Sequence, residues 1–208
     1  MIISHQHKFV FVHNPKTAGS SVKHWLFANG PSLNLKGAKS QYFPLYSDFP
    51  DHFKCSQLED IDFLDDYHKA STVRNTWDRV VSMWRFQIDK GLTKLSFEEY
   101  LLQGLNAFRN ANPNKKRRFP RFSMTPPQHV YTHVNGEQWV DEIMRFETLQ
   151  DDWKELQKAI GIDPSPLPHA NKSKTPKPSE WTQDLSDIVS EVYAKDISLF
   201  GCTPPEFK

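Results

Sequence analysis

The fold of this 208-residue chain is decided by the stretch Phe9-Val-Phe-Val-His-Asn-Pro-Lys-Thr-Ala-Gly-Ser-Ser-Val22. Its first four residues form a short apolar run of strand-forming side chains, and the turn signal Asn14-Pro15 ends that run, which predicts a buried parallel strand. A helical pattern begins at Ser20 and stops at Gly30-Pro31. The sequence therefore predicts a strand, a tight loop of small residues and a helix in direct succession.

The rest of the chain continues this alternation. Weaker strand patterns cover Lys69 to Val73 and Val140 to Phe146. Helices are predicted over Leu58 to Asp66, Trp77 to Lys90, the Ser96 capping box to Gln103, Thr148 to Ile160, and Asp184 to Phe200. Strands that alternate with helices predict a single α/β domain over residues 1–208, with a central parallel sheet of about four or five strands flanked by helices.

Composition restricts the classes of function. The net charge of +1 argues against a dedicated nucleic-acid-binding protein. The two cysteines, Cys55 and Cys202, fit neither a disulfide framework nor a CxxC metal site, so a reducing compartment is expected and no metal is implied. The first twelve residues do not resemble a signal peptide, and no apolar run approaches the ~20 residues of a membrane span. A soluble, cytoplasmic protein is expected.

The loop after the first strand has the chemistry of an anion site. The first N–H groups of a helix lack partners within the helix and carry about half a positive charge. Gly19 allows close approach of the backbone, Lys16 adds a mobile cation, and hydroxyl donors follow at Thr17, Ser20 and Ser21. The lysine precedes the glycine, unlike the order in GxxxxGK[ST]. The loop is predicted to bind a phosphate-like group.

A second segment, Ser71-Thr-Val-Arg-Asn-Thr-Trp-Asp-Arg-Val-Val-Ser82, extends this site. Arg74 comes where the second strand should end, and Ser82 lies between one and two turns into the next helix. Parallel strands open at the same sheet edge, where α/β folds bind ligands. An arginine fork and a serine hydroxyl are therefore expected to hold a second phosphate of the same ligand.

Together the two segments resemble the sulfotransferase superfamily, in particular its carbohydrate sulfotransferase-like branch. In that family PKTxGTS binds the 5′-phosphosulfate of 3′-phosphoadenosine 5′-phosphosulfate (PAPS), and the arginine and serine of VRxPxxRxxS bind its 3′-phosphate. The resemblance implies PAPS contacts at Pro15, Lys16, Thr17, Ala18, Gly19, Ser20, Ser21, Arg74 and Ser82. Ser20 stands where threonine is usual, and Thr76 replaces the usual proline. Arg145-Phe-Glu147 and Leu167-Pro-His-Ala-Asn-Lys-Ser173 also look familial, so the resemblance covers nearly the whole chain.

The resemblance implies direct in-line transfer of a sulfuryl group from PAPS to a hydroxyl or amine acceptor, with carbohydrates among the candidates. Lys16 would balance charge on the leaving phosphate. The acceptor must lose a proton, and histidine is the usual base near neutral pH. His52 precedes the second strand where family members tend to place a functional histidine, so it is the first candidate for the base. His13 is the next candidate and is otherwise expected to shape the loop.

Several alternatives stay open. Arg79 either touches the nucleotide or forms a structural ion pair, and His169 either touches the nucleotide or caps a helix. The basic run Lys115 to Arg118 is either a solvated loop or a grip on an acidic acceptor or the nucleotide. A P-loop kinase or NTPase would require a Walker-type loop and an acidic residue at a strand end, where this chain has Arg74. A nucleotide-binding module without catalytic activity is the non-enzymatic alternative.

Overall fold

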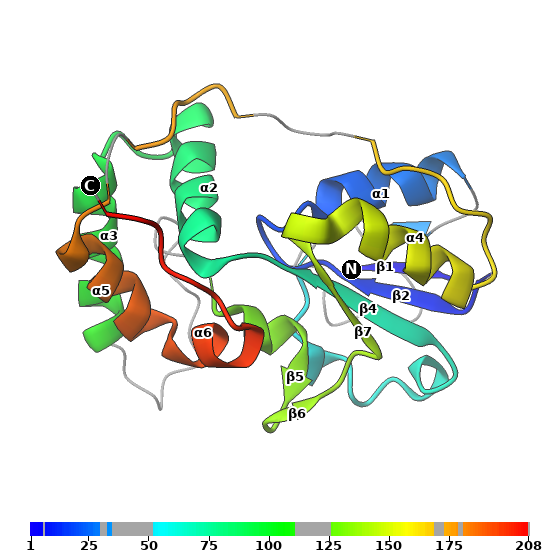
Figure 1. Ribbon diagram of the computed structural model, residues 1–208. Coiled ribbons are helices and arrows are strands. Elements are labelled where there is room, and N and C mark those ends of the chain that lie inside the picture. The colour runs from blue at the N-terminus through cyan, green and yellow to red at the C-terminus, as the bar shows by residue number, and fades with distance from the viewer. Residues whose placement is uncertain are drawn as a thin grey trace. The chain divides into compact units, whose positions relative to one another are not determined.

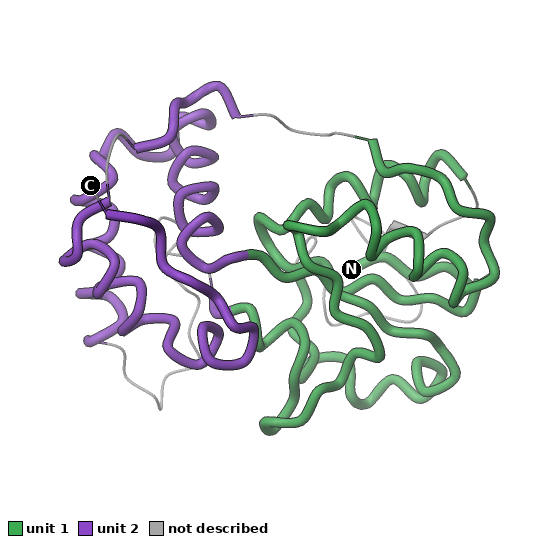
Figure 2. The backbone as a smooth tube through the Cα atoms, in the orientation of Figure 1, with its two compact units in different colours: residues 1–74, 128–171 green, residues 75–127, 172–208 purple. Residues whose placement is uncertain are grey.

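The computed structural model describes residues 1–5, 7–29, 33–34, 52–110, 126–168, 173–178 and 181–207. The chain forms two compact units (Figure 2). Unit 1 comprises residues 1–74 and 128–171, and unit 2 comprises residues 75–127 and 172–208. Each unit has a hydrophobic core of its own.

A five-stranded sheet forms the centre of unit 1, in the order β3-β1-β2-β4-β7 (Figure 1). The strands are β1 (Ile2–Ser4), β2 (Phe9–Val12), β3 (Leu33–Asn34), β4 (His68–Val73) and β7 (Glu142–Arg145). β2, β4 and β7 run parallel, whereas β1 pairs antiparallel with both β2 and β3. The α/β architecture with central parallel strands is confirmed, but the sheet is mixed because β1 and β2 form a hairpin.

Alternating side chains of β2 divide the core of unit 1 between the two faces of the sheet, as the two-residue period of a strand requires. Phe9 and Phe11 pack with residues of α1 (Gly19–Ala28) and α4 (Leu149–Ala159), two helices that lie on the same face (Figure 1). Val10 and Val12 lie in a separate cluster, which includes residues from the short helical turns η1 (Cys55–Gln57), η2 (Asp62–Leu64) and η3 (Gln128–Tyr131). The helix predicted over Leu58 to Asp66 is therefore wrong, since the chain makes separate 3₁₀ turns that bury Cys55, Leu58 and Leu64.

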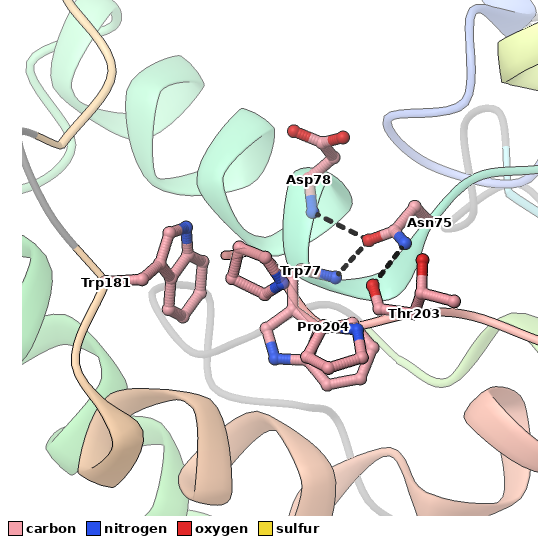
Figure 3. A pocket seen from close by; sticks show the side chains of 7 residues that line it. Asn75, Trp77, Asp78, Trp181, Thr203 and Pro204 are labelled. Carbon is pink, nitrogen blue, oxygen red and sulfur yellow. Dashed lines mark hydrogen bonds between the residues drawn. The ribbon is translucent and has the colours of Figure 1, made fainter. Parts of the chain in front are cut away.

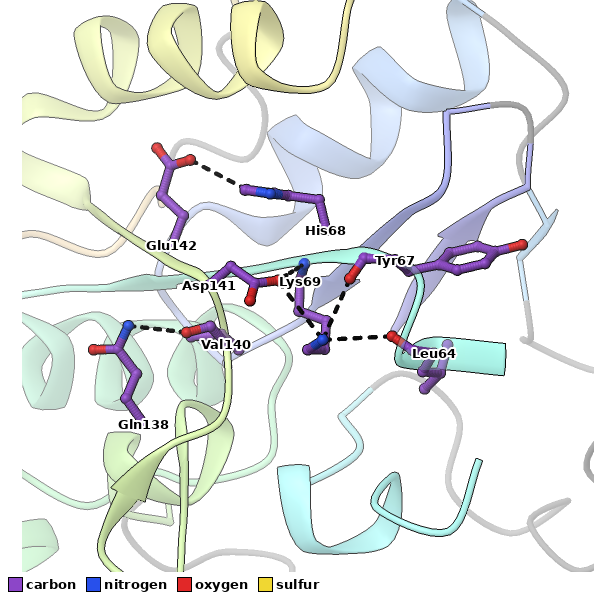
Figure 4. A network of polar contacts seen from close by, with 8 residues as sticks. All are labelled: Leu64, Tyr67, His68, Lys69, Gln138, Val140, Asp141 and Glu142. Atoms are coloured by element: carbon purple, nitrogen blue, oxygen red, sulfur yellow. Dashed lines mark hydrogen bonds and ion pairs between the residues drawn. The ribbon is translucent and has the colours of Figure 1, made fainter. Parts of the chain in front are cut away.

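Polar contacts fix the register where β4 and β7 begin (Figure 4). The Lys69 amide donates to an Asp141 carboxylate oxygen at 2.6 Å, and the Asp141 amide donates to the Lys69 carbonyl at 2.8 Å. Ahead of β7, β5 (His133–Val134) and β6 (Glu137–Gln138) form a small hairpin. Its turn residues, Asn135 and Gly136, both have positive φ, as a two-residue Asn-Gly hairpin turn requires.

Unit 2 is helical, with α2 (Thr76–Asp89), α3 (Phe97–Arg109), α5 (Gln183–Val192) and α6 (Ala194–Phe200). α3 begins at the predicted Ser96–Glu99 capping box and runs past Gln103 to Arg109. The predicted terminal helix is divided into α5 and α6 at Tyr193, whose side chain is buried in the core of the unit. η4 (Phe146–Thr148) belongs to unit 1 and leads into α4.

The C-terminal half of α2 holds a distant stretch of the chain. The Asp89 carboxylate accepts hydrogen bonds from the Ser173 and Thr175 hydroxyls and from the Lys174 and Thr175 amides. These donors hold the pKa of Asp89 well below its usual range. Arg85 donates to the Thr175 carbonyl at 2.6 Å. Residues 173–175 are thus hydrogen-bonded to the side chains of two residues of α2.

A pocket of about 240 Å³ lies at the other end of α2 (Figure 3). Its lining includes Asn75, Trp77 and Trp181. Asn75 Oδ1 accepts from the amides of Trp77 and Asp78, and Asn75 Nδ2 donates to the Thr203 carbonyl. The helix N-terminus at this pocket is therefore already capped. No helix within the described ranges is long and apolar enough to cross a membrane.

Candidate functional site

The loop between β2 and α1 has an unusual backbone. Lys16 and Ala18 adopt left-handed conformations, with φ of 67° and 68°. Such conformations cost about 1–3 kcal/mol each in residues other than glycine, and they gather at ligand sites. Alternation of left- and right-handed residues turns successive N–H groups toward one side and makes an anion-binding concavity. The loop conformation therefore favours a negatively charged ligand.

The N-terminus of α1 lacks the charge compensation of the other helices. Its N-cap residue is Ala18, which has no side chain able to cap, and the first turn has no acidic residue. Each of the other five α-helices in the described part of the chain carries Asp or Glu in its first turn. Because the partial positive charge of a helix N-terminus favours an anion, α1 is the helix best prepared to receive one.

Burial alternates along the predicted loop. Lys16, Ala18 and Ser20 are partly exposed, whereas Pro15, Thr17, Gly19 and Ser21 are buried. The Thr17 hydroxyl donates to the Asn14 carbonyl at 2.9 Å, so its proton is engaged within the loop. Ser20 is the partly exposed hydroxyl among the predicted donors.

His13 explains why position 19 is glycine. A Cβ atom added to Gly19 would overlap Cδ2 and Nε2 of the His13 imidazole. His13 is 8% exposed, and its pKa lies well below the ordinary value, first because burial disfavours its charged form and second because that form would be repelled by His52, when protonated, and by Lys16, Lys23 and the N-terminal amine. A neutral His13 ring therefore packs against the backbone of the loop, in agreement with the expectation that His13 shapes it.

His52 lies beside this ring, with ring centroids 4.4 Å apart. Its Nδ1 is 2.8 Å from the His13 carbonyl oxygen. A carbonyl oxygen can only accept, so Nδ1 carries the hydrogen and the neutral imidazole has its lone pair on Nε2. The side chain is exposed. The structure thus brings both candidate histidines to the phosphate loop and gives His52 the tautomer that can accept a proton at Nε2.

Arg74 follows β4 directly, as predicted, and its guanidinium lies over the Phe146 ring at 4.0 Å from the centroid. A guanidinium within about 6 Å of an aromatic centroid is held by cation–π attraction. Phe146 belongs to the Arg145-Phe-Glu147 segment noted in the sequence. This segment, which follows β7, therefore supplies a platform for the arginine.

Gln128 links Arg74 to the loop, and sequence reasoning missed it. Its Oε1 accepts from the Arg74 amide at 2.9 Å, and its Nε2 donates to the Arg74 carbonyl at 2.8 Å. Asn14 Nδ2 donates to the same Oε1 at 3.4 Å and to the Thr72 carbonyl at 2.9 Å. Gln128 and Asn14 are both fully buried. Gln128 follows a proline-rich stretch, and no motif in the sequence marks it.

The remaining predicted residues are Ser82, Arg79, His169 and the basic run. Ser82 is a partly exposed residue of α2 in unit 2. Arg79 is fully buried, and its Nη2 donates to the Pro126 carbonyl at 3.0 Å, which is a structural contact within unit 2. His169 and the basic run Lys115 to Arg118 lie outside the described residues.

Comparisons with known proteins identify a family and a solved structure that are similar to this chain. A sequence profile described as the sulfotransferase family matches residues 1–202 and thus includes residues of both units. A crystal structure of a sulfotransferase from Alicyclobacillus acidocaldarius is similar over 92% of each chain, with 17% sequence identity and a TM-score of 0.49. No curated protein matches the sequence.

Proposed function

Because the chain belongs to the sulfotransferase family, we propose that it takes the sulfuryl group from PAPS and passes it to a hydroxyl or amine acceptor, with carbohydrates among the candidates. Both units are proposed to form one functional domain, since the family match extends across residues of both. The two free thiols are in keeping with a reducing compartment such as the cytoplasm.

One observation carries the proposed donor site: the N-terminus of α1 has an alanine N-cap and no acidic residue in its first turn, directly after two left-handed loop residues. The sulfuryl oxygens and the 5′-phosphate of the donor are anionic, and this helix end offers amide donors with a favourable dipole. Lys16, partly exposed in the same loop, adds a positive charge. We assign the 5′-phosphosulfate to this loop, from Pro15 to Ser21.

Arg74 and Ser82 are proposed to bind the 3′-phosphate of the donor. Support for Arg74 comes from its place directly after β4 and from its guanidinium, which Phe146 holds by cation–π contact. A guanidinium can bind two phosphate oxygens at once. Support for Ser82 comes from the sequence motif that it shares with Arg74. A 3′-phosphate would distinguish PAPS from ATP.

The proposed transfer is a direct in-line displacement at sulfur. A bond forms between the acceptor oxygen or nitrogen and sulfur, while the bond between sulfur and the bridging phosphate oxygen breaks. Lys16 stabilises the charge that grows on the leaving phosphate, and the loop amides hold the sulfuryl oxygens. A pre-placed contact of this kind contributes about 3–4 kcal/mol to the transition state.

His52 is proposed to take the acceptor's proton at Nε2. Support comes from the hydrogen bond between its Nδ1 and the His13 carbonyl, which fixes both the tautomer and the position of the ring. Histidine is the usual proton acceptor of this kind near neutral pH. His13 is less suited to this role because burial lowers its pKa well below the ordinary value.

The test is transfer of the label from ³⁵S-labelled PAPS to a panel of sugars, phenols, peptides and amines, with the wild-type chain and Lys16→Ala in parallel. We expect at least one acceptor to be labelled by the wild type, with strongly reduced labelling by the variant. Failure to label any acceptor class, together with failure to bind 3′-phosphoadenosine 5′-phosphate (PAP), would contradict the proposed function.

A further inference from the structure

We propose that Gln128 is a positioning residue that couples the two phosphate-binding parts of the donor site. The inference rests on the proposed function, because it assigns Arg74 to the 3′-phosphate and the loop to the 5′-phosphosulfate. Gln128 contacts the backbone of Arg74 and the side chain of Asn14, the residue that precedes Pro15 in the loop. One buried amide thus connects both parts.

The partners fix the orientation of the Gln128 amide. The Arg74 N–H can only donate and the Arg74 carbonyl can only accept, so Oε1 must face the former and Nε2 the latter. This pair of bonds resembles the pairing of two strands, although β4 itself ends at Val73. The side-chain amide of Gln128 therefore bonds to the Arg74 backbone as a neighbouring strand would. It fixes the position of the backbone from which the arginine side chain extends.

The same Oε1 accepts from Asn14 Nδ2 at 3.4 Å, and Nδ2 also donates to the Thr72 carbonyl at 2.9 Å. Asn14 in turn accepts the Thr17 hydroxyl at its carbonyl, within the turn that contains Lys16. A continuous chain of hydrogen bonds therefore runs from Arg74 through Gln128 and Asn14 into the phosphate loop. Because each of these linking side chains is fully buried, none can exchange its bonds for water without rearrangement.

The position of Gln128 in the chain adds an independent reason for this role. The chain leaves unit 1 after Arg74 and re-enters it at Gln128. The residues at which the chain leaves and re-enters unit 1, Arg74 and Gln128, are therefore hydrogen-bonded to each other. Loss of this link would allow the backbone of Arg74 to move relative to the loop while the β2–β4 pairing, which extends to Val12 and Ser71, stays intact.

The test measures how much the 3′-phosphate contributes to affinity. Isothermal titration gives the Kd of PAP and of AMP, which lacks the 3′-phosphate, for wild type and for Gln128→Met, a side chain of similar length without hydrogen-bonding groups. We expect the ratio of the AMP Kd to the PAP Kd to fall by about tenfold in the variant, equivalent to about 1.4 kcal/mol. A purely structural residue would lower the melting temperature but leave this ratio unchanged in the folded protein.

Gln157→Met is the matched control, because Gln157 is equally buried in unit 1 and its Oε1 also accepts a backbone amide, that of Ser165, at 3.0 Å. We expect Gln157→Met to lower the melting temperature but to leave the ratio of the AMP Kd to the PAP Kd unchanged. If Gln128→Met does not fold, Gln128→Asn, which keeps an amide too short to hold both Arg74 groups, replaces it. An unchanged ratio in the folded Gln128 variant, or an equal loss in the control, overturns the inference. If wild type itself binds PAP no better than AMP, it is the proposed function that fails.

Discussion

Gly19→Ala tests the contact that shapes the phosphate loop. The new methyl group would overlap three atoms of the His13 ring, Cδ2, Nε2 and Cγ. The ring is 8% exposed and lies against His52 and Phe11, with centroids 4.4 and 6.1 Å away, so it cannot turn aside without moving them. Overpacking of this kind costs about 1–3 kcal/mol. Subtracting about 1 kcal/mol for the better helix propensity of alanine leaves a net loss of up to about 2 kcal/mol.

The assay is a double-mutant cycle by urea unfolding with Gly19→Ala, His13→Ala and the combined variant. Once the ring is gone, the methyl group no longer meets it, so Gly19→Ala should be neutral or stabilising by up to about 1 kcal/mol in the His13→Ala background. The expected coupling energy is therefore about 1–3 kcal/mol, within the range for residues in contact. Equal losses in both backgrounds would refute the argument that His13 is the reason for glycine at this position.

Three further outcomes are expected at the loop. Lys16→Ala should lower turnover by about 10²–10³-fold while PAP affinity falls less, and turnover within about twofold of wild type would remove Lys16 from the chemistry. His52→Ala should lower turnover by about 10²–10⁴-fold and flatten the acidic limb of the pH–rate profile, while PAP affinity is retained. If only His13→Ala shows this behaviour, His13 is the base. Because the pKa of His13 is lowered in the folded state, the unfolded chain binds a proton at His13 more readily than the folded chain does. The contribution of His13 to the free energy of unfolding should therefore be fully present above about pH 6.5, the ordinary histidine pKa. It should fall by up to about 1.4 kcal/mol per pH unit as the pH drops from there toward the folded-state pKa. Thermal unfolding from pH 7 to 5 should show a weaker dependence in His13→Gln, and an identical dependence would assign the effect to other groups.

Local patterns in the sequence predicted the elements that carry the site. The apolar run Phe9 to Val12 became the buried strand β2, and the turn at Asn14-Pro15 led into α1 as expected. The end of β4 at Val73 placed Arg74 at the sheet edge. These features depend on neighbouring residues and on the rule that parallel strands open at one edge, so a single sequence suffices to find them.

Long-range contacts were not predictable in the same way. β1 has only three residues, which are too few to show the two-residue hydrophobic period of a strand. It is defined by its pairing with β2 and β3. Gln128 lies 54 residues from Arg74 along the chain, and its role arises from two buried hydrogen bonds. The left-handed conformations of Lys16 and Ala18 also run against residue preference, since glycine or asparagine is favoured there. Deviations of this kind are expected where function, rather than propensity, sets the backbone.

The donor site is proposed to bind a nucleotide through both its 5′- and its 3′-phosphate. The most direct measurement is the melting temperature of the wild-type chain with PAP, ATP and AMP at equal concentrations. A ligand at about 100 times its Kd stabilises the folded state by about 2.7 kcal/mol, which corresponds to a rise of roughly 5–10 °C for a chain of this size. The proposed donor site predicts such a rise with PAP and a much smaller one with ATP or AMP. Equal shifts with ATP and PAP, or no shift with PAP, would contradict it.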